Sequence, residues 1–127
     1  MREILFRGKR IGNQGWIEGC YIKRVVRCGM IAYVTSSYPS EPVKVHTLTL
    51  GQYIGLTDKN GNKIFEGDVV YYTSEGEYGQ ITYSEDEAMF MVEFDGWCTN
   101  FDYLHGKELE VVGNIHDNPE LLKGGAE

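Results

Sequence analysis

The sequence predicts an all-β fold that is mainly antiparallel. Of its 127 residues, 16 are Gly and nine are Tyr, and short runs rich in Val, Ile and Tyr alternate with glycine turns. β-branched and aromatic residues favour strands, and closely spaced turns keep those strands short. No apolar run approaches the ~20 residues of a membrane helix. We therefore expect a protein with no membrane partner.

Two regions are expected along the chain. Residues 1–56 should form an N-terminal β-sheet region, and residues 57–127 should form a small SH3-like barrel with a short C-terminal helix. About five short strands linked by tight turns, in roughly 60 residues, suit a small antiparallel barrel. An OB-type barrel fits less well, because no helix is visible between the third and fourth of these strands.

In the N-terminal region, turn signals separate the expected strands. Asn13 to Gly15 and the Cys28-Gly29 pair are typical of turns, and residues 36–42 hold two Pro and three Ser. Strands are expected over residues 2–6, 16–26, 30–35 and 43–50, and a glycine-flanked connection over residues 51–56. Alternation around Trp16 and Ile22 predicts that Cys20 is a core or half-core thiol.

In the C-terminal region, the turn chemistry is stronger. Residues 58–61 (DKNG) and 66–68 (EGD) supply the turn types that Gly, Asn and Asp favour. Strands are expected over residues 63–65, 69–73, 80–83, 88–94 and 109–115, and another over residues 97–103. The short helix should begin with Asn118 as N-cap and Pro119 at the first helical position, with Glu120 near its positive end.

Charge is distributed unevenly between the two halves. Residues 1–47 carry eight Lys or Arg and three acids, a net charge of +5, whereas residues 48–127 carry four Lys and sixteen acids, a net charge of −12. The simplest interpretation is an uneven solvated surface, but opposite halves also favour self-association or a local basic face. The net charge of −7 does not support a general nucleic-acid binder. Any nucleic-acid contact would have to use the basic residues of the N-terminal half, which are Arg7, Lys9, Arg10, Lys23, Arg24 and Arg27.

The three cysteines are expected to be reduced thiols of a cytosolic protein. Cys20, Cys28 and Cys98 form no CxxC pair, and the N-terminal residues do not resemble a signal peptide. The spacing of Cys20 and Cys28 with a His matches no recognised zinc pattern.

A calcium loop is equally unsupported. Residues 58–62 resemble its beginning, but Lys63 and Val69 stand where that loop needs Gly and Glu. We therefore expect no metal ligand and no cofactor.

No catalytic motif stands out either, and we expect the protein not to be an enzyme. The enzymatic alternative would use Asp68, or Cys98 with His105 or His116, as nucleophile and base. We expect Asp68 instead to accept backbone N–H groups in its turn.

Aromatic residues are the best candidates for a protein interface. Tyr71 and Tyr72 are adjacent on one expected strand, so only one of them can face the core. Tyr71, Tyr72, Tyr78 and Trp97 are the residue types that anchor protein interfaces.

Three ordered motifs resemble the YopX family of phage and prophage proteins. They are residues 51–70 (GQYIGLTDKNGNKIFEGDVV), residues 2–10 with 15–19 (REILFRGKR and GWIEG), and residues 110–122 (EVVGNIHDNPELL). The resemblance implies a small all-β protein that forms homo-oligomers, and it implies no established activity. Its signature residues are turn and cap types: Gly55, Asp58, Gly61, Glu66, Gly67, Asp68, Gly113, Asn118 and Pro119.

The sequence therefore predicts a phage or prophage protein that acts by binding, to itself and to a host or phage protein. One alternative is nucleic-acid association through the basic N-terminal half. Another is an acidic region that mimics DNA and inhibits a host protein.

Overall fold

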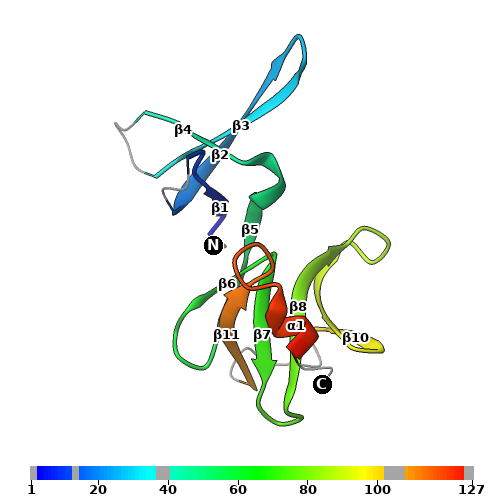
Figure 1. Cartoon of the computed structure of the whole chain (residues 1–127). Coiled ribbons are helices and arrows are strands. Elements are labelled where there is room, and N and C mark those ends of the chain that lie inside the picture. The colour runs from blue at the N-terminus through cyan, green and yellow to red at the C-terminus, as the bar shows by residue number, and fades with distance from the viewer. Residues whose placement is uncertain (1–2, 13–14, 37–40, 102–107, 125–127) are drawn as a thin grey trace. The chain divides into compact units, whose positions relative to one another are not determined.

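A computed structural model of the chain describes residues 3–12, 15–36, 41–101 and 108–124. The predicted all-β, mainly antiparallel class is confirmed, with one short helical turn near the C-terminus (Figure 1). The chain divides into two compact units, Met1–Tyr53 and Ile54–Glu127. Within the described residues, no helix has the length and apolar character needed to cross a membrane.

The first unit is built on one antiparallel sheet. Its elements are β1 (Phe6–Lys9), β2 (Trp16–Val26), β3 (Gly29–Thr35), β4 (Val43–Val45), the 3-10 turn η1 (Thr47–Thr49) and the start of β5 (Gly51–Thr57). The strand order is β4-β3-β2-β1-β5. The core side chains Ile17, Ala32, Val34 and Val45 pack together and are buried.

Three expectations for the strands of this unit were wrong in detail. The strand expected over residues 2–6 is β1, which begins only at Phe6 and continues to Lys9. The strand expected over residues 43–50 ends at Val45, because residues 46–50 bond locally instead of continuing the ladder. Thr49 donates from both its N–H and its hydroxyl to the His46 carbonyl, at 3.0 and 2.6 Å. The connection expected over residues 51–56 is strand β5, since Gly51 and Gln52 pair with β1.

Cys20 is exposed, so the predicted core thiol was wrong. The alternation along β2 was correct, but the opposite face of the strand is buried, with Ile17 and Gly19 inward and Trp16 and Cys20 outward. A Cβ on Gly19 would lie 1.9 Å from the Thr35 carbonyl oxygen, so this inward position admits no side chain. The alternation of side chains along a strand does not by itself show which of its two faces packs against the core.

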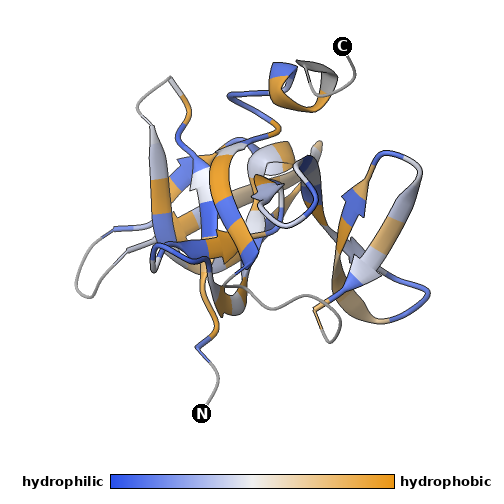
Figure 2. Cartoon of the chain, turned by 90° about the horizontal axis from the view of Figure 1, so that it is seen from below, coloured by the Kyte–Doolittle hydropathy of each residue, from blue (hydrophilic) through white to orange (hydrophobic). Residues whose placement is uncertain are grey.

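The second unit contains a five-stranded antiparallel sheet and strand β6, which neighbours β5. Its elements are β6 (Lys63–Phe65), β7 (Asp68–Tyr72), β8 (Glu77–Ser84), β9 (Met89–Phe94), β10 (Trp97–Asn100), β11 (Leu109–Asn114) and α1 (Glu120–Gly124). The sheet order is β10-β9-β8-β7-β11. Burial alternates along the middle of β8, where Gly79 and Ile81 are buried, whereas β7 is buried at four of its five positions. Figure 2 shows the hydrophobic residues that these strands carry. The finer SH3-like barrel assignment stays a prediction.

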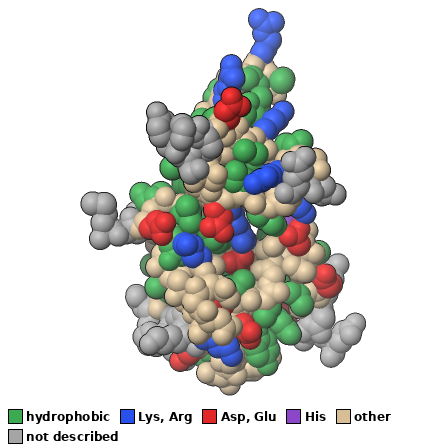
Figure 3. All heavy atoms as spheres, turned by 90° about the vertical axis from the view of Figure 1, so that its left-hand side faces the viewer, with side chains coloured by type: hydrophobic (Ala, Val, Ile, Leu, Met, Phe, Trp, Pro, Cys, Tyr) green, Lys and Arg blue, Asp and Glu red, His purple; other side chains and the backbone are tan. Residues whose placement is uncertain are grey.

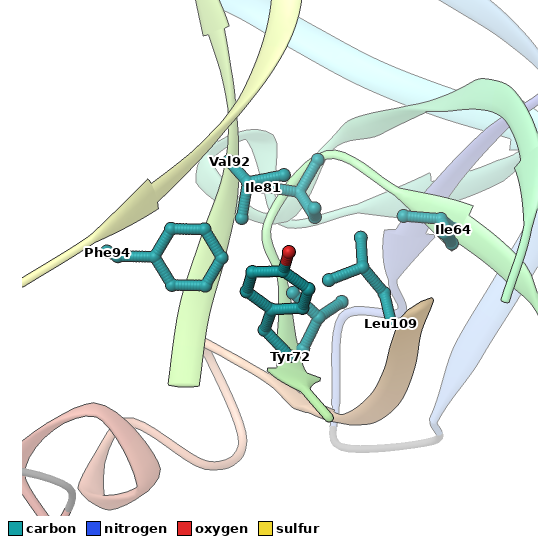
Figure 4. Packing of buried hydrophobic residues seen from close by; sticks show 7 residues of the cluster. Ile64, Tyr72, Ile81, Val92, Phe94 and Leu109 are labelled. Atoms are coloured by element: carbon teal, nitrogen blue, oxygen red, sulfur yellow. The ribbon is translucent and has the colours of Figure 1, made fainter. Parts of the chain in front are cut away.

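Seven side chains form the core of the second unit. Ile64, Tyr72, Ile81, Val92, Phe94 and Leu109 point toward one another in Figure 4, and Val70 completes the cluster. Burying each large side chain stabilises the fold by about 1.5–3 kcal/mol. Gly79 makes room for this packing, because a Cβ there would lie 2.8 Å from the Phe94 ring.

The C-terminal turn depends on Gly113 and Asn118. The Asn118 side-chain oxygen accepts the Asn114 N–H at 3.3 Å, so it bonds to β11 rather than capping the helix as predicted. A Cβ at Gly113 would lie 2.6 Å from that same oxygen. The approach of the two segments therefore requires glycine at position 113.

We expect Gly113→Ala to lower the free energy of unfolding by about 1–3 kcal/mol, because the added methyl group overpacks this contact. Urea unfolding would measure it. A double-mutant cycle would combine this variant with Asn118→Ala, which removes the closest opposing atoms. The double variant should lose less free energy of unfolding than the sum of the losses of the two single variants. If the free-energy changes of the two single variants added up exactly in the double variant, the proposed steric clash would be contradicted.

Candidate functional site

The basic residues that the sequence singled out fall into two groups in the first unit. Arg7, Lys9 and Arg10 lie at or beside β1 and are half-buried. The Arg7 guanidinium lies 4.8 Å from the centre of the Trp16 ring, a cation–π contact across the β1–β2 pair. These residues are largely engaged with their own sheet.

Lys23, Arg24 and Arg27 form the second group and are exposed. They lie in the distal part of the β2–β3 hairpin, where Figure 3 shows Lys and Arg side chains among apolar ones. Glu18 lies near the start of β2, and no acid occurs between it and Glu41 in the sequence, so the distal part of this hairpin carries only positive charge.

The same hairpin exposes apolar side chains. Val25 is 75% exposed, and Ile22 and Met30 are each 41% exposed. Because β2 and β3 pair as far as Val26 and Gly29, the hairpin is ordered to its end by its own ladder. Exposed apolar groups on an ordered, charged element are typical of interaction surfaces.

A groove of about 500 Å³ lies along one face of this hairpin. Ile22 and Tyr33 are directly paired across β2 and β3 and belong to its lining. The remaining lining residues are Lys23, Arg24, Glu41 and Pro42. We name this feature the hairpin groove. It combines apolar side chains with two cations and one acid.

Most of the aromatic interface candidates in the second unit pack against neighbouring side chains of their own unit. Tyr72 is 7% exposed and belongs to the core, whereas Tyr71 faces the other side and packs on Tyr78 with ring centres 5.0 Å apart. Trp97 is 38% exposed, but it stacks on Phe94 at 4.5 Å, and its indole N–H lies 3.5 Å from Glu77 Oε1. Tyr72 is therefore a core residue and does not belong to the candidate surface.

A more open aromatic pair flanks the turn between β8 and β9. Tyr83 is 45% exposed and packs edge-on against Phe90, with ring centres 5.2 Å apart. The turn between them carries three successive exposed acids, Glu85, Asp86 and Glu87. We name residues 83–90 the acidic turn.

The residues of the enzymatic alternative are placed as follows. Asp68 is 1% exposed, and its carboxylate accepts the Phe65 N–H at 2.8 Å, as expected for a turn residue. Cys98 is exposed on β10, and His105 lies outside the described residues. His116 donates its backbone N–H to Asn114. Among the described residues, no three His, Cys, Asp or Glu side chains gather to hold a metal ion.

Asp58 is the most heavily bonded carboxylate that the structure describes. It is 4% exposed, and its oxygens accept the backbone N–H groups of Asn60, Asn62 and Val111 at 2.8–2.9 Å, and the Asn62 side-chain amide at 3.3 Å. Burial alone would raise the pKa of Asp58, but the hydrogen bonds from Val111, Asn62 and Asn60 together lower it below its ordinary value.

We expect Asp58→Asn to lower the free energy of unfolding at pH 7 by about 2 kcal/mol, because one N–H donor must then face an amide NH₂ group. The folded-state pKa is lowered, so the stabilisation is complete above the ordinary carboxyl pKa and is lost as the pH falls toward the lowered value. The wild type should therefore lose more stability in acid than the variant.

Urea unfolding followed by Trp97 fluorescence in a Trp16→Phe background would report on the second unit. Glu75→Gln removes an exposed carboxylate and serves as the matched control. If Asp58→Asn and the wild type lost the same stability in acid, Asp58 would not be the group that makes the protein acid-sensitive.

Comparisons with known proteins agree with this fold. The crystal structure of protein EF1440 from Enterococcus faecalis is similar over 96% of this chain and 99% of that one, with a TM-score of 0.58 and 23% sequence identity. At that identity the likeness shows the fold alone. No curated protein matches the chain at a significant level.

The family comparison covers nearly the whole chain. The family described as YopX protein matches residues 6–123, from the start of β1 into α1. The resemblance carried by the three sequence motifs is thereby confirmed, and the chain belongs to the YopX family.

Proposed function

We propose that this protein is a non-enzymatic binding or assembly module of a phage or prophage, acting in the bacterial cytoplasm by associating with itself and with a protein partner. One observation carries the proposal: the two units have opposite charge, and the positive unit presents its charge on an ordered hairpin that also exposes apolar side chains. Residues 1–53 have a net charge of +5, and residues 54–127 have a net charge of −12. Oppositely charged surfaces favour encounter, and exposed apolar groups add affinity.

The engagement of the signature residues supports a binding role. Asp58 and Asp68 accept backbone N–H groups, Gly67 has a φ of +91°, and Asn118 bonds to β11. The side chains with the best catalytic chemistry in these motifs are thus used to hold turns. This leaves the exposed surfaces as the places where the chain can act.

Nucleic-acid association is the second candidate, and the hairpin is the observation that favours it. Lys23, Arg24 and Arg27 are exposed on a segment without acids. A two-stranded ribbon of this kind can follow a phosphate backbone. The acidic second unit opposes it.

We expect the purified chain to form an oligomer at low ionic strength whose mass, measured by light scattering, falls as salt rises, because screening weakens attraction between opposite surfaces. Raising protein concentration at fixed salt should restore the larger mass. A chain that stays monomeric at low salt and high concentration would refute self-association.

The nucleic-acid candidate makes a separate prediction. If three cations of the hairpin contact phosphates, log K for a labelled DNA duplex should fall with log salt with a slope of about −2.7. Fluorescence anisotropy would measure this slope. Absence of binding at low salt would eliminate the candidate without affecting the self-association result.

A further inference from the structure

We infer that the hairpin groove is a receptor for the acidic turn of a second copy of the chain. The inference rests on the proposed self-association and names the two surfaces that carry it. The groove is lined by Ile22, Lys23, Arg24, Tyr33, Glu41 and Pro42. The acidic turn spans residues 83–90 and contains Tyr83, Glu85, Asp86, Glu87 and Phe90.

The chemistry of the groove selects an acidic ligand that also carries an apolar group. Arg24 supplies a cation on the face of β2 that Ile22 shares, and Lys23 lines the groove from the position between them, whereas Ile22, Tyr33 and Pro42 supply apolar contact area. Ile22 is 41% exposed in the free chain, so contact area there is available to a partner. Covering it with an aromatic side chain adds hydrophobic stabilisation to the ionic attraction.

The acidic turn matches this requirement on both counts. Its three acids are successive and exposed, and Tyr83 beside them is 45% exposed. The turn has a defined shape, because the Glu87 N–H donates to the Ser84 hydroxyl at 3.2 Å and Tyr83 is braced by Phe90. A preformed turn loses little conformational entropy when it binds.

Other acids that the structure describes fit less well. Asp58 and Asp68 are buried, Glu77 lies against the Trp97 indole, and Glu110 lies 3.9 Å from Lys59. Glu75, Glu93 and Asp95 are exposed, but no acid of the described chain other than Glu85, Asp86 and Glu87 belongs to a run of three successive exposed carboxylates. Charge complementarity therefore selects the acidic turn as the occupant of the groove.

Glu41 makes it possible to predict the direction in which a charge change should alter the contact. It is the single acid in the groove lining, and it must repel an incoming carboxylate. Its neutralisation should tighten the contact, while reversal of Arg24 should weaken it. A surface that bound basic or neutral partners would respond in the opposite sense or not at all.

The test compares charge reversals inside and outside the two surfaces by sedimentation and light scattering at low salt. Arg24→Glu and Asp86→Lys should each weaken self-association at least about tenfold, and Glu41→Gln should strengthen it. Lys63→Glu and Glu75→Lys make the same charge changes at exposed positions outside both surfaces, and each should stay within about twofold of the wild type.

Mixing the two weakened variants is the decisive arm. The unaltered turn of the Arg24→Glu chain meets the unaltered groove of the Asp86→Lys chain, and the reversed pair is also complementary. An equimolar mixture should therefore associate to within about threefold of the wild type. Restoration on mixing requires contact between different copies.

The outcomes separate the two proposals. A wild-type oligomer on which Arg24→Glu acts no more strongly than Lys63→Glu would overturn the groove assignment while leaving self-association standing. A monomeric wild type would overturn both. If Arg24→Glu left self-association intact but abolished binding to the labelled DNA duplex, the groove would be a nucleic-acid site and the inference would be wrong.

Discussion

The second unit depends on one buried carboxylate that joins two distant segments. Asp58 fixes its own turn through the N–H groups of Asn60 and Asn62, and the same side chain accepts the N–H of Val111 on β11. The neighbouring backbone bond from Lys59 to the Leu109 carbonyl strengthens this junction. Because β11 pairs with β7, whose residues Val70 and Tyr72 belong to the core, the junction positions one edge of the sheet.

The same arrangement gives the carboxylates of the signature motifs a structural role. An ionised carboxylate that accepts several backbone N–H groups is stabilised in its charged form and is a weak base. Asp58 is held in this way, and Asp68 is committed to the turn before β7. The exposed hairpin and the acidic turn, on which we propose that the protein acts, contribute little to either core.

Turn chemistry made much of the fold predictable, since Asn-Gly and Gly-Asp positions restrict the backbone through local interactions. The helical turn and most strands of the second unit were predicted for this reason. The buried face of β2 was not, because packing around Gly19 and Thr35 decides it. Of the candidate site, the sequence predicted only the basic residues Lys23, Arg24 and Arg27. Glu41 and Pro42 line the groove because the fold brings them beside β2 and β3, which the sequence alone does not show.

The bond between Asp58 and Val111 also bears on how fast this unit forms. It closes a loop of 53 residues, and the β7–β11 pairing spans a similarly long separation. Contacts between residues far apart in sequence lose much chain entropy before any bonding compensates for it. We therefore expect the hairpins β7–β8 and β8–β9 to form early, and the arrival of β11 to limit the folding rate. Until then, the edge of β7 that later receives β11 is an open template for pairing with other chains.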